Sequence, residues 1–125
     1  MATTAALLAN KGHTVSGSDK NVFPPMSDFL AAEGIPILKG FHEDRITDEL
    51  DLVVVGNVVS RGNPEIEAVL ERRVRCCSLP EIVRDEFLWK KRPIVLAGTH
   101  GKTTTTAMTG WLLVHAGLDP TVLVG

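Results

Sequence analysis

The sequence predicts an α/β fold, a Rossmann-like parallel sheet with helices on both faces. Apolar segments typical of strands alternate with helical segments along the chain, which indicates βαβ units. The run LDLVVVGN is apolar without alternation, as expected of a strand covered by helices on both sides. The composition agrees with this class, because 44% apolar and 22% charged residues are ordinary values for a globular protein.

The expected helices are framed by capping residues. Gly12, Gly34 and Gly117 each follow a segment with helical composition, as a C-terminal capping glycine does. Asn63 and Pro64 open another segment, because Asn is a good N-cap and Pro suits the first helical position. These signals predict helices at residues 2–11, 27–33, 63–73, 79–89 and 102–117.

The expected strands lie between these helices, at residues 13–19, 35–40, 50–57, 74–78, 92–98 and 121–125. A doubly wound sheet normally begins with a strand and a glycine turn before its first helix, whereas this sequence opens inside a helix. We therefore expect the sheet to lack its first strand. The strands at TVSGS and DLVVVG would then have unpaired edges, which bind other strands. We expect the gap to be filled either by the RPIVLA segment or by a second copy of the chain, which would form a homo-oligomer.

The charged run KKRP indicates a domain boundary. The length of 125 residues fits one domain, or one domain and a piece of another. We expect an N-terminal domain at residues 1–90 and the beginning of a second domain at residues 91–125.

The net charge of −2 gives no attraction to nucleic acid or to anionic membranes. No apolar run approaches the roughly 20 residues of a membrane helix. Two adjacent cysteines, Cys76 and Cys77, suit a reducing cytoplasm, where we expect the protein to be.

The segment AGTHGKTTTT predicts a phosphate-binding loop. It lies between the apolar run PIVL and an expected helix, an order in which backbone N–H groups surround phosphate oxygens. Gly101, Lys102 and Thr103 match the end of the G-x-x-x-x-G-K-[ST] pattern, although Leu96 occupies the place of its first glycine. Phosphate binding is favoured over a glycine turn that only caps a helix. Lys102 would bridge the β- and γ-phosphates, and Thr103 would ligate Mg²⁺.

The ends of two other strands provide further candidates. Ser18 and Asp19 end an early strand, where an acidic residue often binds ribose hydroxyls, although loop capping explains them equally well. Asn57 ends the most apolar strand and either binds a ligand amide or closes a turn. Trp89 and Trp111 lie on apolar helical faces and are expected in the core.

The segment AGTHGKTTTTAMTGWLL resembles the ATP-binding loop of the Mur ligase family, whose members share the pattern G-[TS]-[HN]-G-K-[ST]-[TS]-T. This variant of the pattern accounts for Leu96. The runs GHTVSGSDKNVFPPMSDFLAAEGI and VVVGNVVSRGNPEIEAVL are similar to the UDP-binding first domain of members that act on UDP-N-acetylmuramate. The NVFPPMS loop is more similar to members that attach a murein peptide than to members that attach L-alanine.

The resemblance implies an ATP-dependent ligase of peptidoglycan recycling, with a UDP domain, a P-loop ATPase domain and a domain for the incoming amine. ATP would phosphorylate the muramate carboxylate, and L-alanyl-γ-D-glutamyl-meso-diaminopimelate would attack the acyl phosphate. Lys102 would be the catalytic residue and Thr103 would ligate Mg²⁺. Ser18, Asp19 and Asn57 would contact UDP. The ATP loop would consist of Gly98, Thr99, His100, Gly101, Lys102, Thr103 and Thr104.

The sequence also departs from the family. The first strand, the glycine turn for UDP and everything after Gly125 are absent, so we expect the chain alone to be inactive. Two alternatives stay open, a ligase that adds L-alanine and a nucleotide-binding module without catalysis. A dinucleotide oxidoreductase is supported only by the βα alternation, because no G-x-G-x-x-G occurs.

Overall fold

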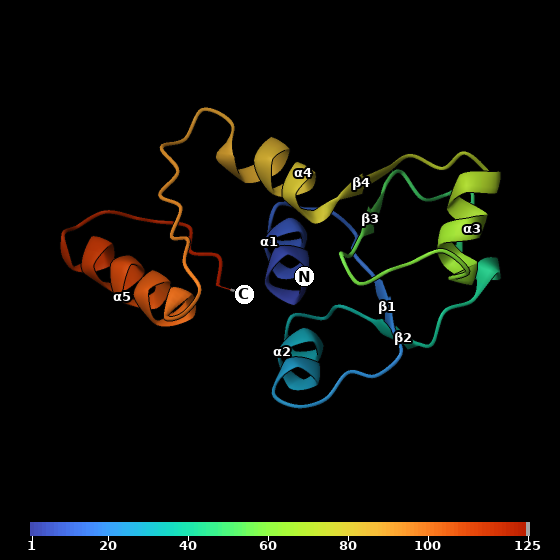
Figure 1. Cartoon of the computed structure of the whole chain (residues 1–125), viewed down its shortest axis with the longest axis horizontal. Coiled ribbons are helices and arrows are strands. Elements are labelled where there is room, and N and C mark those ends of the chain that lie inside the picture. Colours follow the sequence, from blue (N-terminus) through green and yellow to red (C-terminus); the bar gives the residue numbers. More distant parts are fainter. Residues whose placement is uncertain (125) are drawn as a thin grey trace. The chain divides into compact units, whose positions relative to one another are not determined.

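The computed structural model describes residues 1–124 and divides into two compact units, one from Met1 to Trp89 and one from Lys90 onward (Figure 1). Parallel strand pairs connected through helices confirm the predicted α/β class. Every helix among the described residues is too short or too polar to cross a lipid bilayer.

The first unit begins with helix α1 and a parallel βαβ motif. Strand β1 (Gly17–Asp19) pairs in parallel with β2 (Ile37–Lys39). Helix α1 (Ala2–Asn10) precedes β1, and helix α2 (Met26–Ala32) connects the two strands. Apolar side chains from both helices and from the approach to β2 form one buried cluster, made of Ala6, Leu30 and Ile35.

A second parallel pair completes this unit. Strand β3 (Val53–Val55) pairs with β4 (Cys76–Ser78), and helix α3 (Pro64–Glu71) connects them. The short helix η1 (Glu43–Arg45) contacts α3. A second buried cluster lies beneath α3 and consists of Ile46, Ala68 and Val69. Each strand pair therefore has its own apolar core.

The last helical segment of the first unit is α4 (Leu79–Val83), which continues into the π-helical turn η2 (Arg84–Leu88). The Glu81 carboxylate accepts hydrogen bonds from the Ser78 hydroxyl and N–H, both at 2.7 Å, which lowers the pKa of Glu81. Lys11 Nζ donates to Glu86 Oε2 at 2.6 Å, which lowers the pKa of Glu86 and ties the end of α1 to η2.

The two strand pairs do not join into one sheet. Strands β1 and β3 each have a single partner, and residues 1–124 contain no strand between them, where a doubly wound sheet places its first strand. The proposal that RPIVLA fills this gap is wrong, because residues 92–98 form no strand. Residues 121–124 form none either, and Gly125 lies outside the described residues. An extended segment becomes a strand only when its N–H and C=O groups find a partner, which these segments lack.

The second unit is built around helix α5 (Lys102–His115). Gly101 precedes it with φ +73°, the left-handed conformation that glycine adopts most easily.

The prediction that both tryptophans are buried is wrong, because Trp89 is 70% exposed and Trp111 is 60% exposed. Trp111 stacks on His115 with ring centroids 3.9 Å apart. An apolar helical face is buried only where another segment packs on it, and within this unit Val122 packs against α5 at Gly110, whereas Trp111 stays exposed.

We predict that the N-cap of α3 stabilises the chain. Asn63 Oδ1 accepts hydrogen bonds from the N–H groups of Glu65 at 2.9 Å and Ile66 at 3.2 Å. Asn63→Ala should lower the free energy of unfolding by about 1 kcal/mol, measured by urea denaturation. Asn63→Asp keeps the acceptor and should stay within about 0.5 kcal/mol of the wild type. An equal loss in both variants would contradict the capping role.

We also predict that Gly101 is required for the start of α5. A Cβ at this position would come near only Thr105 Oγ1, at 3.9 Å, so the obstacle is the positive φ rather than space. The Thr105 N–H donates to the Gly101 carbonyl at 2.9 Å. In Gly101→Ala its amide exchange should accelerate about tenfold, because left-handed backbone costs an L-residue about 1–2 kcal/mol. The matched control is Gly98→Ala, at a glycine without positive φ, and it should accelerate exchange less. Similar rates in the two variants would count against the prediction.

Candidate functional site

The predicted site residues fall into two groups, one in each unit. The residues predicted to bind ATP lie in the second unit, between Gly98 and Thr104. Ser18, Asp19 and Asn57, which are predicted to contact UDP, lie in the first unit. We therefore describe two half-sites, each within its own unit.

The predicted phosphate loop has the backbone of an anion-binding turn. The chain turns through Gly101 in the left-handed conformation and enters α5 directly at Lys102. The first N–H groups of a helix have no partner within the helix, and they lie at the positive end of its dipole. Fourteen helical residues follow, so α5 is long enough for this dipole to be developed.

The Lys102 side chain folds back across the loop. Its Nζ donates to the Gly98 carbonyl at 2.7 Å and lies 3.3 Å from the Thr99 carbonyl. The ammonium group therefore lies at the loop, on an exposed side chain. A positive charge beside a glycine turn and a helix N-terminus is an arrangement suited to a phosphate group.

Several threonines of α5 bond to the helix rather than to its first N–H groups. Thr105, Thr106 and Thr109 donate their hydroxyls to carbonyls one turn earlier, each at 2.8 Å. These hydroxyls therefore do not cap the helix N-terminus. His100 Nδ1 lies 3.2 Å from the Thr99 hydroxyl, so the imidazole contacts the turn itself.

The donor groups for a metal are few. Among residues 1–124, no three His, Cys, Asp or Glu side chains gather in a way that would hold a metal ion. Mg²⁺ in nucleotide sites usually takes one or two protein ligands together with substrate phosphates. The hydroxyl oxygen of Thr103, in the first turn of α5, fits such a partial ligand set.

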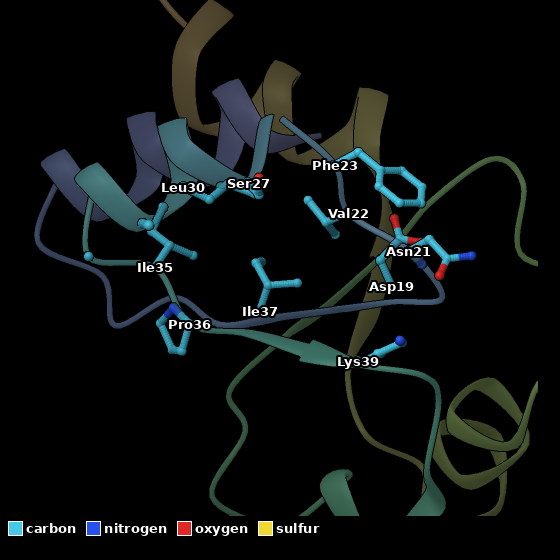
Figure 2. Close-up of a pocket in the computed structure, with 12 residues that line it drawn as sticks. Asp19, Asn21, Val22, Phe23, Ser27, Leu30, Ile35, Pro36, Ile37 and Lys39 are labelled. Atoms are coloured by element: carbon cyan, nitrogen blue, oxygen red, sulfur yellow. Dashed lines mark hydrogen bonds between the residues drawn. The ribbon is translucent and has the colours of Figure 1, made fainter. Parts of the chain in front are cut away.

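Asp19 lies at the end of β1 and at the rim of a cavity of about 600 Å³. Its Oδ1 accepts a hydrogen bond from the Asn21 N–H at 3.3 Å, so it closes the loop after the strand. Figure 2 shows Asp19, Asn21 and Lys39 at one end of the cavity, and Leu30 and Ile35 toward the other. An open, largely apolar cavity with polar groups at one end is typical of small-molecule sites.

Ser18 has a partner that the sequence does not reveal. Its hydroxyl donates to Glu65 Oε2 at the start of α3. Asn57 lies in the loop between β3 and α3, in an exposed turn closed by the Val59 N–H on the Gly56 carbonyl at 3.1 Å. Glu65 thus connects the end of β1 to the helix that follows the Asn57 loop.

Sequence reasoning missed Glu65 and Arg45. Glu65 Oε1 lies 3.6 Å from an Arg45 guanidinium nitrogen, and the two side chains are 14% and 24% exposed. The only sequence signal is an acidic residue in the first turn of a helix, which is common and indicates nothing beyond the helix dipole. Its contact with Ser18 crosses 47 positions of the sequence and requires the fold.

The comparisons with known proteins agree on one family. The family model described as "Mur ligase family, catalytic domain" matches residues 1–86. The UDP-N-acetylmuramate–L-alanyl-γ-D-glutamyl-meso-2,6-diaminoheptandioate ligase of Escherichia coli K12 is 42% identical over all 125 residues, which cover 27% of that protein.

Solved structures give the same result. The UDP-N-acetylmuramate:L-alanyl-γ-D-glutamyl-meso-diaminopimelate ligase of Neisseria meningitidis superposes with a TM-score of 0.94 and 39% identity, over all of this chain and 39% of that one. The UDP-N-acetylmuramate–alanine ligase MurC of Thermotoga maritima superposes with a TM-score of 0.90 and 34% identity, over all of this chain and 29% of that one. The chain thus spans about a quarter of the length of the curated relatives it matches. With the family model covering residues 1–86 and these similarities running along the whole chain, the protein belongs to the Mur ligase family.

Proposed function

We propose that this chain provides the UDP-binding region and the ATP phosphate loop of a ligase that joins UDP-N-acetylmuramate to a murein tripeptide. The observation that carries the proposal is the 42% identity, along the whole chain, to an E. coli ligase named for that tripeptide. We assign residues 1–90 to the sugar nucleotide and residues 91–125 to the start of the ATP-binding domain.

Lys102 is the proposed catalytic residue. ATP would transfer its γ-phosphoryl group to the muramate carboxylate, and the peptide amine would then displace phosphate from the acyl phosphate. Negative charge spreads over the transferring group, and an ammonium held at its oxygens offsets that charge. Lys102 Nζ lies against the loop carbonyls of Gly98 and Thr99, so its charge is already beside the proposed phosphate position.

The rest of the loop binds and orients ATP in this proposal. Gly101 allows the turn, the first N–H groups of α5 point toward the phosphates, and the segment from Gly98 to Thr104 surrounds them. Thr103 would hold Mg²⁺, and the bound ion would supply further charge neutralisation.

The sugar nucleotide would lie at the carboxyl ends of β1 and β3. Asp19 and Ser18 are proposed to face the ribose, and Asn57 is proposed to contact the nucleotide from the loop after β3. We place the reaction in the cytoplasm, which is consistent with two free cysteines, Cys76 and Cys77.

A ligase that adds L-alanine is the second candidate. It is favoured by the 34% identity to MurC of Thermotoga maritima, which superposes over the whole chain. The two candidates share the sugar nucleotide and ATP, so only the amine substrate separates them.

The test uses the full-length product of the gene that encodes this segment. With ATP, Mg²⁺ and UDP-N-acetylmuramate, we expect phosphate release to depend on the tripeptide and to be much slower with L-alanine. A preference for L-alanine would support the second candidate. UDP-sugar binding without ligation of either amine would indicate a module that binds nucleotides only.

In the same protein, Lys102→Ala should abolish ligation and weaken ATP binding about 10- to 100-fold, because charge-assisted hydrogen bonds to phosphate are lost. UDP-N-acetylmuramate affinity, measured by calorimetry, should remain unchanged. Lys91→Ala removes a nearby exposed charge outside the loop and should behave as wild type. Parallel losses of ATP and sugar-nucleotide affinity in Lys102→Ala would show that one site serves both ligands.

We propose further that the 125-residue chain associates with a second copy through its unpaired strand edges. The Val53 N–H donates at 2.9 Å to the carbonyl of Arg75, the residue just before the neighbouring strand β4. Successive residues of a strand direct their N–H groups to opposite sides, so the Val54 N–H faces the free edge of β3. Such an edge is a template for another strand.

Light scattering of the chain should therefore report a dimer at micromolar concentration. Val54→Pro removes the edge N–H without removing a bond to β4, and it should yield a monomer. Val54→Ala shortens the side chain but keeps the N–H, so it should remain dimeric. A monomeric wild type across the concentration range would refute edge-mediated association.

A further inference from the structure

The chain leaves the first unit through a residue in a strained conformation. Lys90, the first residue of the second unit, has φ +61°. A left-handed backbone is uncommon for residues other than glycine, because it brings the Cβ too close to a carbonyl oxygen. The Lys90 side chain is exposed and makes no hydrogen bond or ion pair within residues 1–124. Its side-chain contacts therefore do not hold it in this conformation.

Arg73 shows how a left-handed residue is normally held. Within the described chain it is the other non-glycine residue with positive φ, at +56°, and it follows the end of α3. The Val74 N–H donates to the Val69 carbonyl at 3.0 Å, which closes the chain around Arg73 as helix C-terminal motifs do. By contrast, residues 90–97 make no backbone hydrogen bond to any described residue. A strained conformation that its surroundings do not hold exchanges with unstrained ones.

The structure immediately before Lys90 is fixed. The Trp89 N–H donates to the Arg84 carbonyl at 3.1 Å and closes η2. Lys11 Nζ donates both to the Glu86 carbonyl at 2.8 Å and to Glu86 Oε2 at 2.6 Å, so the end of α1 holds this turn. The conformational freedom of the connection therefore begins at Lys90. Hinges consist of a few such residues, at the end of an element, that absorb a large change in φ and ψ.

We propose that Lys90 is a positioning residue, a hinge that exchanges between the left-handed conformation and one with negative φ. This inference rests on the proposed function, in which the first unit binds the muramate carboxylate and the second unit binds ATP. Phosphoryl transfer requires the carboxylate and the γ-phosphate to meet in a reactive geometry, whereas each half-site is built within its own unit. The backbone at Lys90 controls how often these two groups meet.

Two substitutions at Lys90 bias the hinge in opposite directions. Lys90→Gly removes the cost of the left-handed conformation and should raise its population relative to the other conformation about tenfold. Lys90→Pro fixes φ near about −65° and excludes the left-handed conformation. Proline otherwise suits this position, because the Lys90 N–H makes no backbone hydrogen bond to a described residue. Trp89 also already has ψ 125°, which the residue before a proline prefers.

The test measures the distance between two spin labels by pulsed electron paramagnetic resonance. The labels are carried by unnatural amino acids that replace Glu71 and Asp119 in the full-length gene product. Both positions are exposed, and each lies in a different unit. The wild type should show two label distances. The distance that gains about tenfold in relative population in Lys90→Gly should be the one that disappears in Lys90→Pro.

Turnover should depend on the same exchange. The kcat of ligation should fall in both variants, about tenfold in Lys90→Pro, because one of the two arrangements is lost. The Kd values for ATP and for UDP-N-acetylmuramate, each measured alone by calorimetry, should equal those of the wild type, because each half-site lies within one unit.

Two control variants should behave as the wild type in label distances and in kcat. Lys90→Ala removes the charge but keeps the backbone restrictions of an L-residue. Arg73→Gly relaxes a left-handed residue that the Val74 N–H already holds in place. An equal loss of kcat in Lys90→Ala and Lys90→Pro would assign the effect to the lysine charge and overturn the hinge.

The label distances separate this inference from the proposed function, because they are measured without ligands. Label distances that are the same in the wild type, Lys90→Gly and Lys90→Pro would overturn the hinge, whatever the protein binds. The expected shifts in a protein that binds neither ATP nor UDP-N-acetylmuramate would support the hinge and refute the ligase. If Lys90→Pro does not fold, Lys90→Gly decides the matter, because wild-type distance populations in that variant would overturn the hinge.

Discussion

The contact between the Glu65 carboxylate and the Ser18 hydroxyl connects the two strand pairs of the first unit. Backbone pairing joins β1 to β2 and β3 to β4, but it does not join the two pairs. Side chains must supply that connection, and Glu65 does so from the helix that follows β3. Because Arg45 and the His42 N–H share the same carboxylate, its charge is compensated despite its burial.

The parts of the fold that the sequence predicts well are those set by residues close together in the chain. Local signals predicted α3 and α5, because Asn63, Pro64 and Gly117 act on neighbouring backbone only. Parallel pairing followed from the alternation of strands and helices. The segment at residues 92–98 has the apolar composition of a strand but forms none, because pairing depends on a partner that composition does not provide.

The two candidate sites also differ in how much of each can be predicted from residues that are neighbours in the sequence. The predicted phosphate loop is contiguous in sequence, so a pattern of glycines, a lysine and threonines is enough to propose it. At the end of β1, Asp19 could be predicted from its position after a strand, but the partner of Ser18 could not. Glu65 and Ser18 are 47 positions apart, and an acidic residue at a helix start has a simpler local explanation. Long-range polar contacts of this kind leave no periodic signal in a single sequence.

The two half-sites also differ in what holds them in place. The first unit has two buried apolar clusters and a network of side-chain hydrogen bonds around Glu65. In the described part of the second unit, Gly110 is the buried residue of α5, and the loop is held mainly by local contacts such as Lys102 on the Gly98 carbonyl. The acceptors of Lys102 are neutral carbonyls, which bind an ammonium less strongly than a charged phosphate does. An arriving phosphate would therefore displace these contacts at little cost, because a stronger acceptor replaces a weaker one at the same ammonium group.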